Sequence, residues 1–130
     1  MKNFYEYGNP RLDGNNEIED CYIRALVLAT KKDYDYIESL FLKKQKEKDI
    51  EHINSWENIV LVLKDFGYDY VEIKHPSDTK NRKRISTFLK THKEKYIIRS
   101  KGHLCYAENG KVIDTWDSSN NIILGYWKIK

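Results

Sequence analysis

The first half of the chain has apolar residues at helical spacing. Residues 21–30, CYIRALVLAT, are apolar on nearly every side except at Arg24, which is the pattern of a buried helix. Asp20 stands directly before this run and is expected to cap it, which makes Cys21 the first helical residue. The preceding residues 1–16 are rich in Gly, Pro and Asn, and they predict an extended, turn-rich lead-in.

Two further helices are expected before Gly67. In residues 33–44 the apolar side chains recur at helical spacing, so this segment is predicted to be the second helix. The third is expected to begin after Asn54, which forms a capping-box pattern with Glu57. Gly67 would end it. Its apolar face would comprise Trp56, Ile59, Val60 and Leu63.

After Gly67 the pattern predicts mainly β-strands. Residues 68–74, YDYVEIK, alternate and predict a strand, and residues 85–89 fit a short helix. Asn109-Gly110 is a strong signal for a hairpin turn. Helices followed by strands favour the α+β class, with N-terminal helices packed on a C-terminal antiparallel sheet. The β-rich runs of that sheet are YIIRS, HLCYAE, KVIDTW and NIILGYWKI.

The length and composition fit one intracellular domain. The chain has 130 residues, enough for one core, and it has no internal repeat, so we expect a single domain over residues 1–130. No apolar stretch approaches the roughly 20 residues that span a membrane. The segment MKNFYEYGNP lacks the apolar centre of a secretory signal. We therefore expect a cytoplasmic protein without a membrane partner, in which Cys21 and Cys105 are free thiols.

Charge and histidine spacing argue against two other classes of protein. The formal net charge is only +3, and the densest basic run, KNRKR at residues 80–84, has no nucleic-acid reader motif beside it. The four histidines are scattered, and the chain has no Cys-x-x-Cys pair. We expect no nucleic-acid partner, no metal and no other cofactor.

Cys21 is the first candidate for chemistry. A thiol in the first turn of a helix lies near free N–H groups and the positive end of the helix dipole, and both stabilise a thiolate. Glu17, Glu19 and Asp20 act in the opposite direction, so a catalytic role needs a neighbouring imidazolium. Without one, Cys21 would be a small buried filler, the common role of a free cysteine.

His103 is the candidate base. It begins a strand, and the alternation of that strand places it on the same face as Cys105, which is expected to be core filler. The hairpin at Asn109-Gly110 then returns the chain so that Asp114 comes near His103. A carboxylate there would hold the imidazole in one tautomer. Taken singly, each of these two residues also fits a purely structural role.

The order of these residues resembles the papain-like cysteine peptidase superfamily. In that family a cysteine on an early helix precedes a histidine on a late strand, with a carboxylate or amide shortly after. Asn15 lies six positions before Cys21, the spacing of the family's oxyanion-hole glutamine. The run Asp114-Thr115-Trp116 resembles the family's Asn-Ser-Trp, whose tryptophan shields the histidine–amide hydrogen bond from water.

The chain also resembles small single-domain proteins of phages and low-GC Gram-positive bacteria. These carry D-C-x-x-R-A-L near the start, and G-H followed by D-T-W-D near the end. Here the match runs over about residues 15–127 and includes Asp20, Cys21 and Arg24. For a phage-encoded protein, the expected location is the cytoplasm of the host cell.

The resemblance implies a thiol hydrolase, specifically a cysteine peptidase or isopeptidase that acts on a peptide or protein substrate through an acyl-enzyme. Cys21 would be the nucleophile, His103 the base and Asp114 the orienting acid. The backbone N–H of Cys21 and the amide of Asn15 would bind the oxyanion, and Trp116 would be the shield.

Several alternatives stay open at this point. Asn16 can replace Asn15 as the oxyanion donor, and Asp117 can replace Asp114 as the orienting acid. Acyl transfer to an amine is a variant of the hydrolysis. A papain-like protein that does no chemistry, such as a phage-encoded factor that binds a host protein, would have the same fold.

Overall fold

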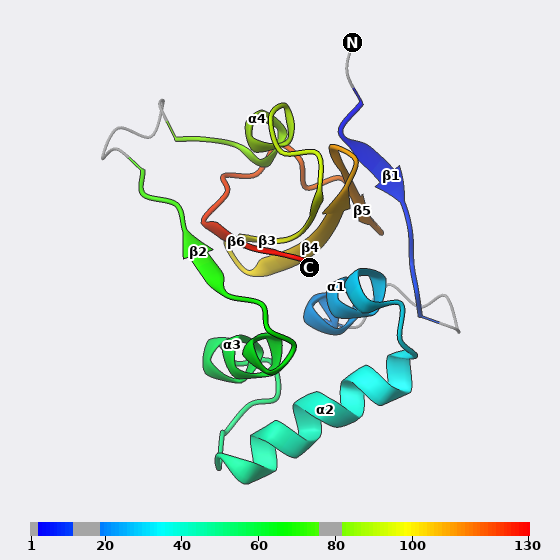
Figure 1. Ribbon diagram of the computed structural model, residues 1–130, viewed down its shortest axis with the longest axis vertical. Coiled ribbons are helices and arrows are strands. Elements are labelled where there is room, and N and C mark those ends of the chain that lie inside the picture. The colour runs from blue at the N-terminus through cyan, green and yellow to red at the C-terminus, as the bar shows by residue number, and fades with distance from the viewer. Residues whose placement is uncertain (1–2, 12–18, 76–81) are drawn as a thin grey trace.

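The computed structural model describes residues 3–11, 19–75 and 82–130, which fold around one six-stranded sheet (Figure 1). The chain is a mixed α+β protein, as predicted. The helices are α1 (Cys21–Thr30), α2 (Tyr34–Glu47), α3 (Trp56–Asp65) and α4 (Ile85–Leu89). The strands are β1 (Tyr5–Tyr7), β2 (Tyr70–Glu72), β3 (Lys95–Ser100), β4 (His103–Glu108), β5 (Lys111–Asp114) and β6 (Gly125–Lys128).

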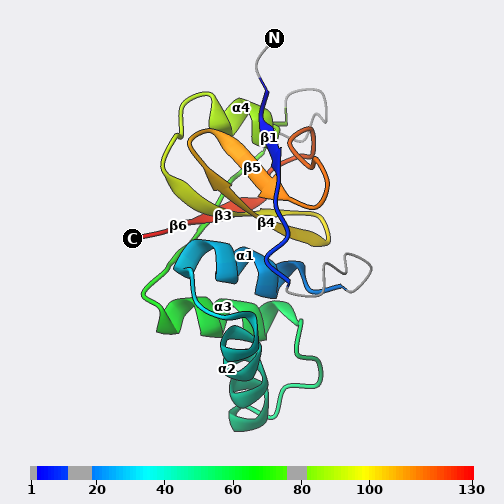
Figure 2. The ribbon, with the colours of Figure 1, turned by 90° about the vertical axis from the view of Figure 1, so that its right-hand side faces the viewer.

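Helices cover both faces of the sheet, as the side view in Figure 2 shows. α1 lies on one face, where it contacts β3 and β4, and α2 packs on the far side of α1 and against α3. α4 lies on the opposite face. The side chains of α1 from Tyr22 to Val27 are buried, which confirms the predicted buried helix. No helix among the described residues is long and apolar enough to cross a membrane.

β4 separates two hydrophobic cores. Leu104 and Tyr106 face the larger core beneath α1, α2 and α3. Cys105 and Ala107 face a smaller core beneath α4. The strand alternates as the sequence predicts, and Cys105 is packed inside the second core.

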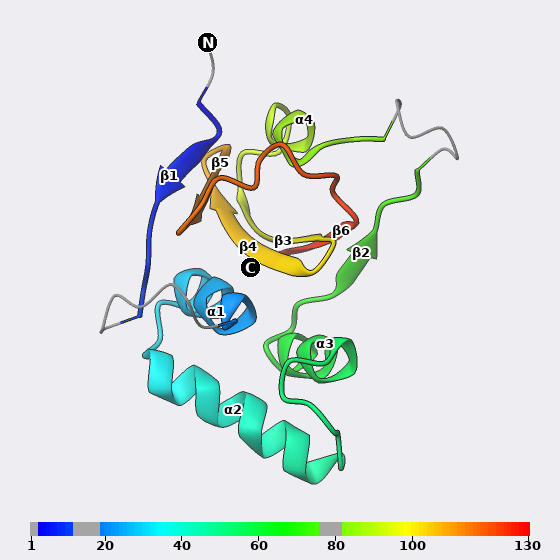
Figure 3. The same cartoon turned by 180° about the vertical axis from the view of Figure 1, so that it is seen from behind.

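The sheet corrects one expectation, because it is neither confined to the C-terminal half nor wholly antiparallel. The strands lie in the order β1-β5-β4-β3-β6-β2, so the two edge strands come from earlier in the chain (Figure 3). β1 pairs with β5 in parallel, and β2 pairs with β6. Part of the predicted lead-in is therefore a strand that covers the open hydrogen-bonding edge of β5. The lead-in residues 12–16 lie outside the described part of the chain.

The local signals for helix starts and turns had mixed outcomes. Asn109 and Gly110 have φ values of 55° and 78° and join β4 to β5, so the predicted hairpin is confirmed. The predicted capping box of α3 is wrong by one residue. Ser55 occupies the N-cap, and its side chain accepts a hydrogen bond from the backbone N–H of Asn58.

Asn58 ties α3 to its surroundings from inside the helical layer. Its side chain is fully buried, and Nδ2 donates to the backbone oxygens of Phe41 at 3.1 Å and Ile53 at 2.7 Å. One amide therefore satisfies a carbonyl of α2 and a carbonyl of the loop before α3. Buried backbone acceptors need such partners, because they have lost their contact with water.

Replacing Asn58 with Ala should lower the free energy of unfolding by about 1–3 kcal/mol, because the Ile53 carbonyl loses its donor and the link to α2 is removed. Urea unfolding followed by circular dichroism measures this. The matched control is Asn120→Ala at an exposed position, which should change stability by less than about 0.5 kcal/mol. Equal stability of the two variants would show that the Asn58 amide does not link the helices.

Candidate active site

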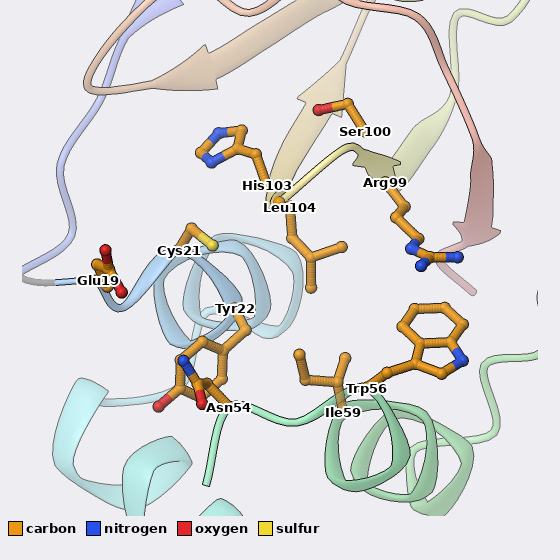
Figure 4. A pocket seen from close by; sticks show the side chains of 11 residues that line it. Glu19, Cys21, Tyr22, Asn54, Trp56, Ile59, Arg99, Ser100, His103 and Leu104 are labelled. Carbon is orange, nitrogen blue, oxygen red and sulfur yellow. The ribbon is translucent and has the colours of Figure 1, made fainter. Parts of the chain in front are cut away.

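Cys21 and His103 meet where the start of α1 approaches one end of the sheet (Figure 4). A two-residue turn, Lys101-Gly102, joins paired residues Ser100 and His103, and Gly102 has the positive φ of 68° that such a turn needs. The turn places His103 at the beginning of β4. Cys21 is half-buried in the first turn of α1, and its side chain lies beside His103 on the wall of one cleft (Figure 4).

The imidazole of His103 is held between a thiol and a carboxylate. Its Nε2 lies 2.7 Å from Oδ2 of Asp114, which leaves Nδ1 for Cys21. The side chains of His103 and Asp114 are only 10% and 7% exposed. Burial lowers the pKa of His103, but the hydrogen bond to Asp114 and the nearby Cys21 side chain outweigh it, and the pKa rises to about 9. His103 is therefore an imidazolium at neutral pH.

Asp114 is fixed by contacts from three parts of the chain. Its Oδ1 accepts a hydrogen bond from the Thr115 backbone N–H at 2.7 Å and lies 3.5 Å from Arg24 Nη1. Its backbone oxygen accepts from Tyr5 Oη and from the Gly8 N–H. β1 thus anchors the main chain of Asp114, while α1 and the following residue anchor its carboxylate.

Arg24 is a site residue to which the sequence alone assigns no role. Its buried guanidinium donates from Nη1 to Thr115 Oγ1 at 2.9 Å and reaches Asp114. Its Nε lies 2.8 Å from Asp20 Oδ1. This is an ion-pair distance, although the N–H is not directed at that oxygen well enough for a hydrogen bond. The available signal was its position as the one charged residue in an otherwise apolar helix.

Asp20 precedes the first helical residue, Cys21, as predicted, but its carboxylate does more than end the helix. It occupies the N-cap position of α1, but its side chain makes no capping hydrogen bond. The carboxylate is buried, pairs with Arg24, and accepts hydrogen bonds from Tyr34 Oη at 2.7 Å and Arg11 Nη1 at 3.4 Å. This acid is neutralised by cations instead of facing Cys21 as an unpaired charge, so the sequence-based objection to a thiolate is weakened.

The residues after Asp114 separate into two roles. The ring of Trp116 lies 4.7 Å from the His103 ring, between centroids, and is 45% exposed. It thus lies between solvent and one side of the imidazole. Asp117, the alternative orienting acid, instead accepts a hydrogen bond from the Ser119 backbone N–H at 2.9 Å. The carboxylate on His103 is that of Asp114.

The first backbone N–H groups of α1 make no intrahelical hydrogen bond. The N–H groups of Ile23 and Arg24 donate to the Asp20 oxygen, so the N–H groups of Cys21 and Tyr22 lie ahead of the first intrahelical bond. Asn15 and Asn16, the two predicted side-chain donors, lie outside the described residues.

A cleft of about 260 Å³ opens beside Cys21 and His103 (Figure 4). The cleft is lined by further residues that the sequence did not connect with the site. They come from α3 and the loop before it, and from β3. These are Asn54, Trp56, Ile59, Arg99 and Ser100. Glu19, whose role the sequence leaves open, lines the end of the cleft near Cys21.

The second thiol is chemically unlike the first. Cys105 is buried beneath α4, and burial raises its pKa to about 12. A thiol with that pKa is protonated at neutral pH and is a poor nucleophile. Within the described ranges, no three His, Cys, Asp or Glu side chains gather in a way that could hold a metal ion.

Comparisons with protein-family models, curated proteins and solved structures found no match to this chain. The papain-like resemblance therefore stays a prediction from the motifs. What the chain does is inferred from the geometry of its own side chains.

Replacing Arg24 with Gln should lower the free energy of unfolding by about 3–5 kcal/mol, because it leaves Asp20 and Asp114 buried without their shared cation. Urea unfolding at neutral pH measures the loss. The control is Lys43→Gln, which removes an exposed i,i+4 partner of Glu47 and should cost about 0.5 kcal/mol or less. Similar losses in both variants would mean that Arg24 is not the link between the two acids.

Proposed function

We propose that this chain is a thiol hydrolase, a cysteine peptidase or isopeptidase that works through an acyl-enzyme. The observation that carries the proposal is the imidazole of His103, which lies between the Cys21 thiol and the Asp114 carboxylate. Three residues far apart in sequence converge here: Cys21 and His103 line one cleft, and Asp114 is hydrogen-bonded to His103 behind it. A half-buried thiol beside an imidazolium is the arrangement that produces a reactive thiolate.

In the first step the Cys21 thiolate attacks the carbonyl carbon of the scissile amide and forms a C–S bond. The resulting oxyanion is stabilised by the N–H groups at the start of α1. The His103 imidazolium then gives its proton to the amide nitrogen, the C–N bond breaks, and an amine leaves. The substrate acyl group remains as a thioester on Cys21, and His103 is neutral.

In the second step a water molecule attacks the thioester carbon while neutral His103 takes one of its protons. The C–S bond then breaks, which releases the carboxylic acid and restores the thiolate–imidazolium pair. Asp114 orients the ring and stabilises its charged form throughout. The ring contact of Trp116 keeps solvent away from one side of the imidazole.

The first test is the reactivity of the two thiols in the folded protein. Iodoacetamide should alkylate Cys21 at least about tenfold faster than Cys105, because the second thiol is buried and protonated. Intact-mass measurement with peptide mapping follows both sites. Equal slow rates would refute the hydrolase and favour a papain-like protein that only binds a partner.

The second test removes the imidazole. His103→Ala should slow alkylation of Cys21 by about tenfold or more at neutral pH, because the thiolate loses its counter-ion. His92→Ala is the control, since His92 stacks on Phe88 beneath α4 and is no part of the cleft. If both variants alkylate at the wild-type rate, Cys21 and His103 are not partners.

The third test uses the pH dependence of folding. The pKa of His103 is raised in the folded chain from 6.5 to about 9, so its stabilising contribution is fully present below pH 6.5 and is lost as the pH rises through about 9. The difference in unfolding free energy between the wild type and His103→Ala should therefore shrink across this interval. Urea titrations at several pH values measure it, and a constant difference would mean that folding does not change the affinity of His103 for its proton.

A further inference from the structure

Arg99 is held in a fixed position at one wall of the cleft. Its guanidinium carbon lies 3.8 Å from the centroid of the Trp56 ring, and its Nη1 donates to Tyr70 Oη at 3.3 Å. A guanidinium stacked on an aromatic face keeps its N–H donors around the edge of the group. Arg99 therefore presents donors to the cleft at a low cost in side-chain entropy.

The ring under Arg99 belongs to an aromatic platform of Trp56, Tyr70 and Trp127. The centroids of Trp56 and Tyr70 are 4.9 Å apart, and those of Tyr70 and Trp127 are 4.8 Å apart. Gly125 on β6 makes room for this packing, because a Cβ there would clash with the Tyr70 ring. Strand β2, helix α3 and strand β6 thus combine to support a single guanidinium.

The charge of Arg99 has no carboxylate partner within ion-pair distance among the described residues. Arg24, the buried arginine of the site, differs because it contacts two carboxylates. An arginine that is oriented by stacking but not neutralised is suited to an anion that arrives from outside. Its fork of donors matches a carboxylate with two parallel hydrogen bonds.

The position of Arg99 relates this anion site to the thiol. Figure 4 shows Arg99 and Trp56 at the far side of the cleft from Cys21, with Leu104 and Ile59 between them. A substrate whose carbonyl group reaches Cys21 would lay an apolar portion over Leu104 and Ile59. The next charged group of the substrate would then contact Arg99.

We propose that Arg99, stacked on Trp56, is a specificity-determining residue that binds a carboxylate of the peptide substrate at the end of the cleft away from Cys21, an inference that rests on the hydrolase proposed above. The carboxylate is either an acidic side chain or a free C-terminus, which share the same chemistry. The acyl-transfer steps do not involve Arg99. Its effect is to select substrates and to align them with Cys21.

Three thiol-reactive peptides test this without a known substrate. Each carries an iodoacetyl group on Leu, so that the leucine can occupy the apolar part of the cleft. The neutral probe is iodoacetyl-Leu-Gln-amide. Iodoacetyl-Leu-Glu-amide adds a side-chain carboxylate, and iodoacetyl-Leu-Gln with a free carboxyl end adds a terminal one. Rates of Cys21 alkylation are divided by the rates of the same probes with free glutathione, which removes their intrinsic differences.

In the wild type at least one acidic probe should label Cys21 about tenfold faster than the neutral probe, since a charge-assisted contact contributes at least about 1.4 kcal/mol. Arg99→Gln should reduce this ratio to near one. Arg99→Lys should keep part of the preference, because it retains the charge without the fork. The matched control is Lys95→Gln, which removes an exposed cation from the same strand outside the cleft and should keep the full preference.

The outcomes separate the two proposals. A preference for only one acidic probe identifies the source of the carboxylate. Equal rates for all three probes in the wild type, or a preference that survives in Arg99→Gln, overturn the role of Arg99 but not the hydrolase. Failure of even the neutral probe to label Cys21 overturns the hydrolase and this inference together. A purely structural role would appear as lower stability of Arg99→Gln in urea with an unchanged probe ratio.

Discussion

Arg24 lies buried between the carboxylates of Asp20 and Asp114, and the arrangement of the side chains around Cys21 depends on this pairing. Removing an ion from water is costly, and an interior tolerates it only when partners of opposite charge are close. Arg11, Asp20, Arg24, Asp114 and His103 form a series in which the charges alternate in sign. Each member partly neutralises its neighbours, so moving one would remove a partner from each neighbour.

This series joins segments that are distant along the chain. Arg11 belongs to the lead-in, Asp20 and Arg24 to the start of α1, Asp114 to the end of β5, and His103 to the start of β4. The parallel pairing of β1 with β5 adds a main-chain anchor through the oxygen of Asp114. Cys21 is thereby held beside an imidazolium by backbone and side-chain contacts together. Preorganisation of this kind is what acyl-transfer chemistry requires, because the dipoles must already point at the reacting atoms.

The opposite side of the cleft follows a different physical principle. Around Arg99 the charge is supported by aromatic rings and one hydroxyl, and the described residues contribute no carboxylate to it. A charge that is paired inside the protein stabilises the arrangement of the segments it joins. A charge that is stacked but unpaired remains available to a ligand. Arg24 and Arg99 thus show two arrangements of the same residue type, one buried and ion-paired and the other on the wall of the cleft.

Much of the fold was predictable because the signals are local. Helical spacing indicated α1, and alternation with Asn109-Gly110 indicated the β4–β5 hairpin and hence the proximity of His103 and Asp114. The capping box predicted the N-cap of α3 at Asn54, one residue too early, because the neighbouring Ser55 also has a side-chain acceptor. Asp20 takes the predicted N-cap position, but its carboxylate pairs with Arg24 and does not accept from a backbone N–H of the helix. A cap is the usual local use of such a residue, but a buried cation one turn later is a stronger partner.

The sequence by itself determined the order of secondary elements, the faces of β4, and a candidate thiol, imidazole and carboxylate. These depend on periodicity and turn chemistry over a few residues. Only the tertiary structure decided that β1 adds to β5 in parallel, that Arg24 bridges two acids, and that Trp56 supports Arg99 on the side of the cleft away from Cys21 (Figure 4). Strand edges and buried charges choose partners by distance in space, and separation along the chain carries no information about that distance.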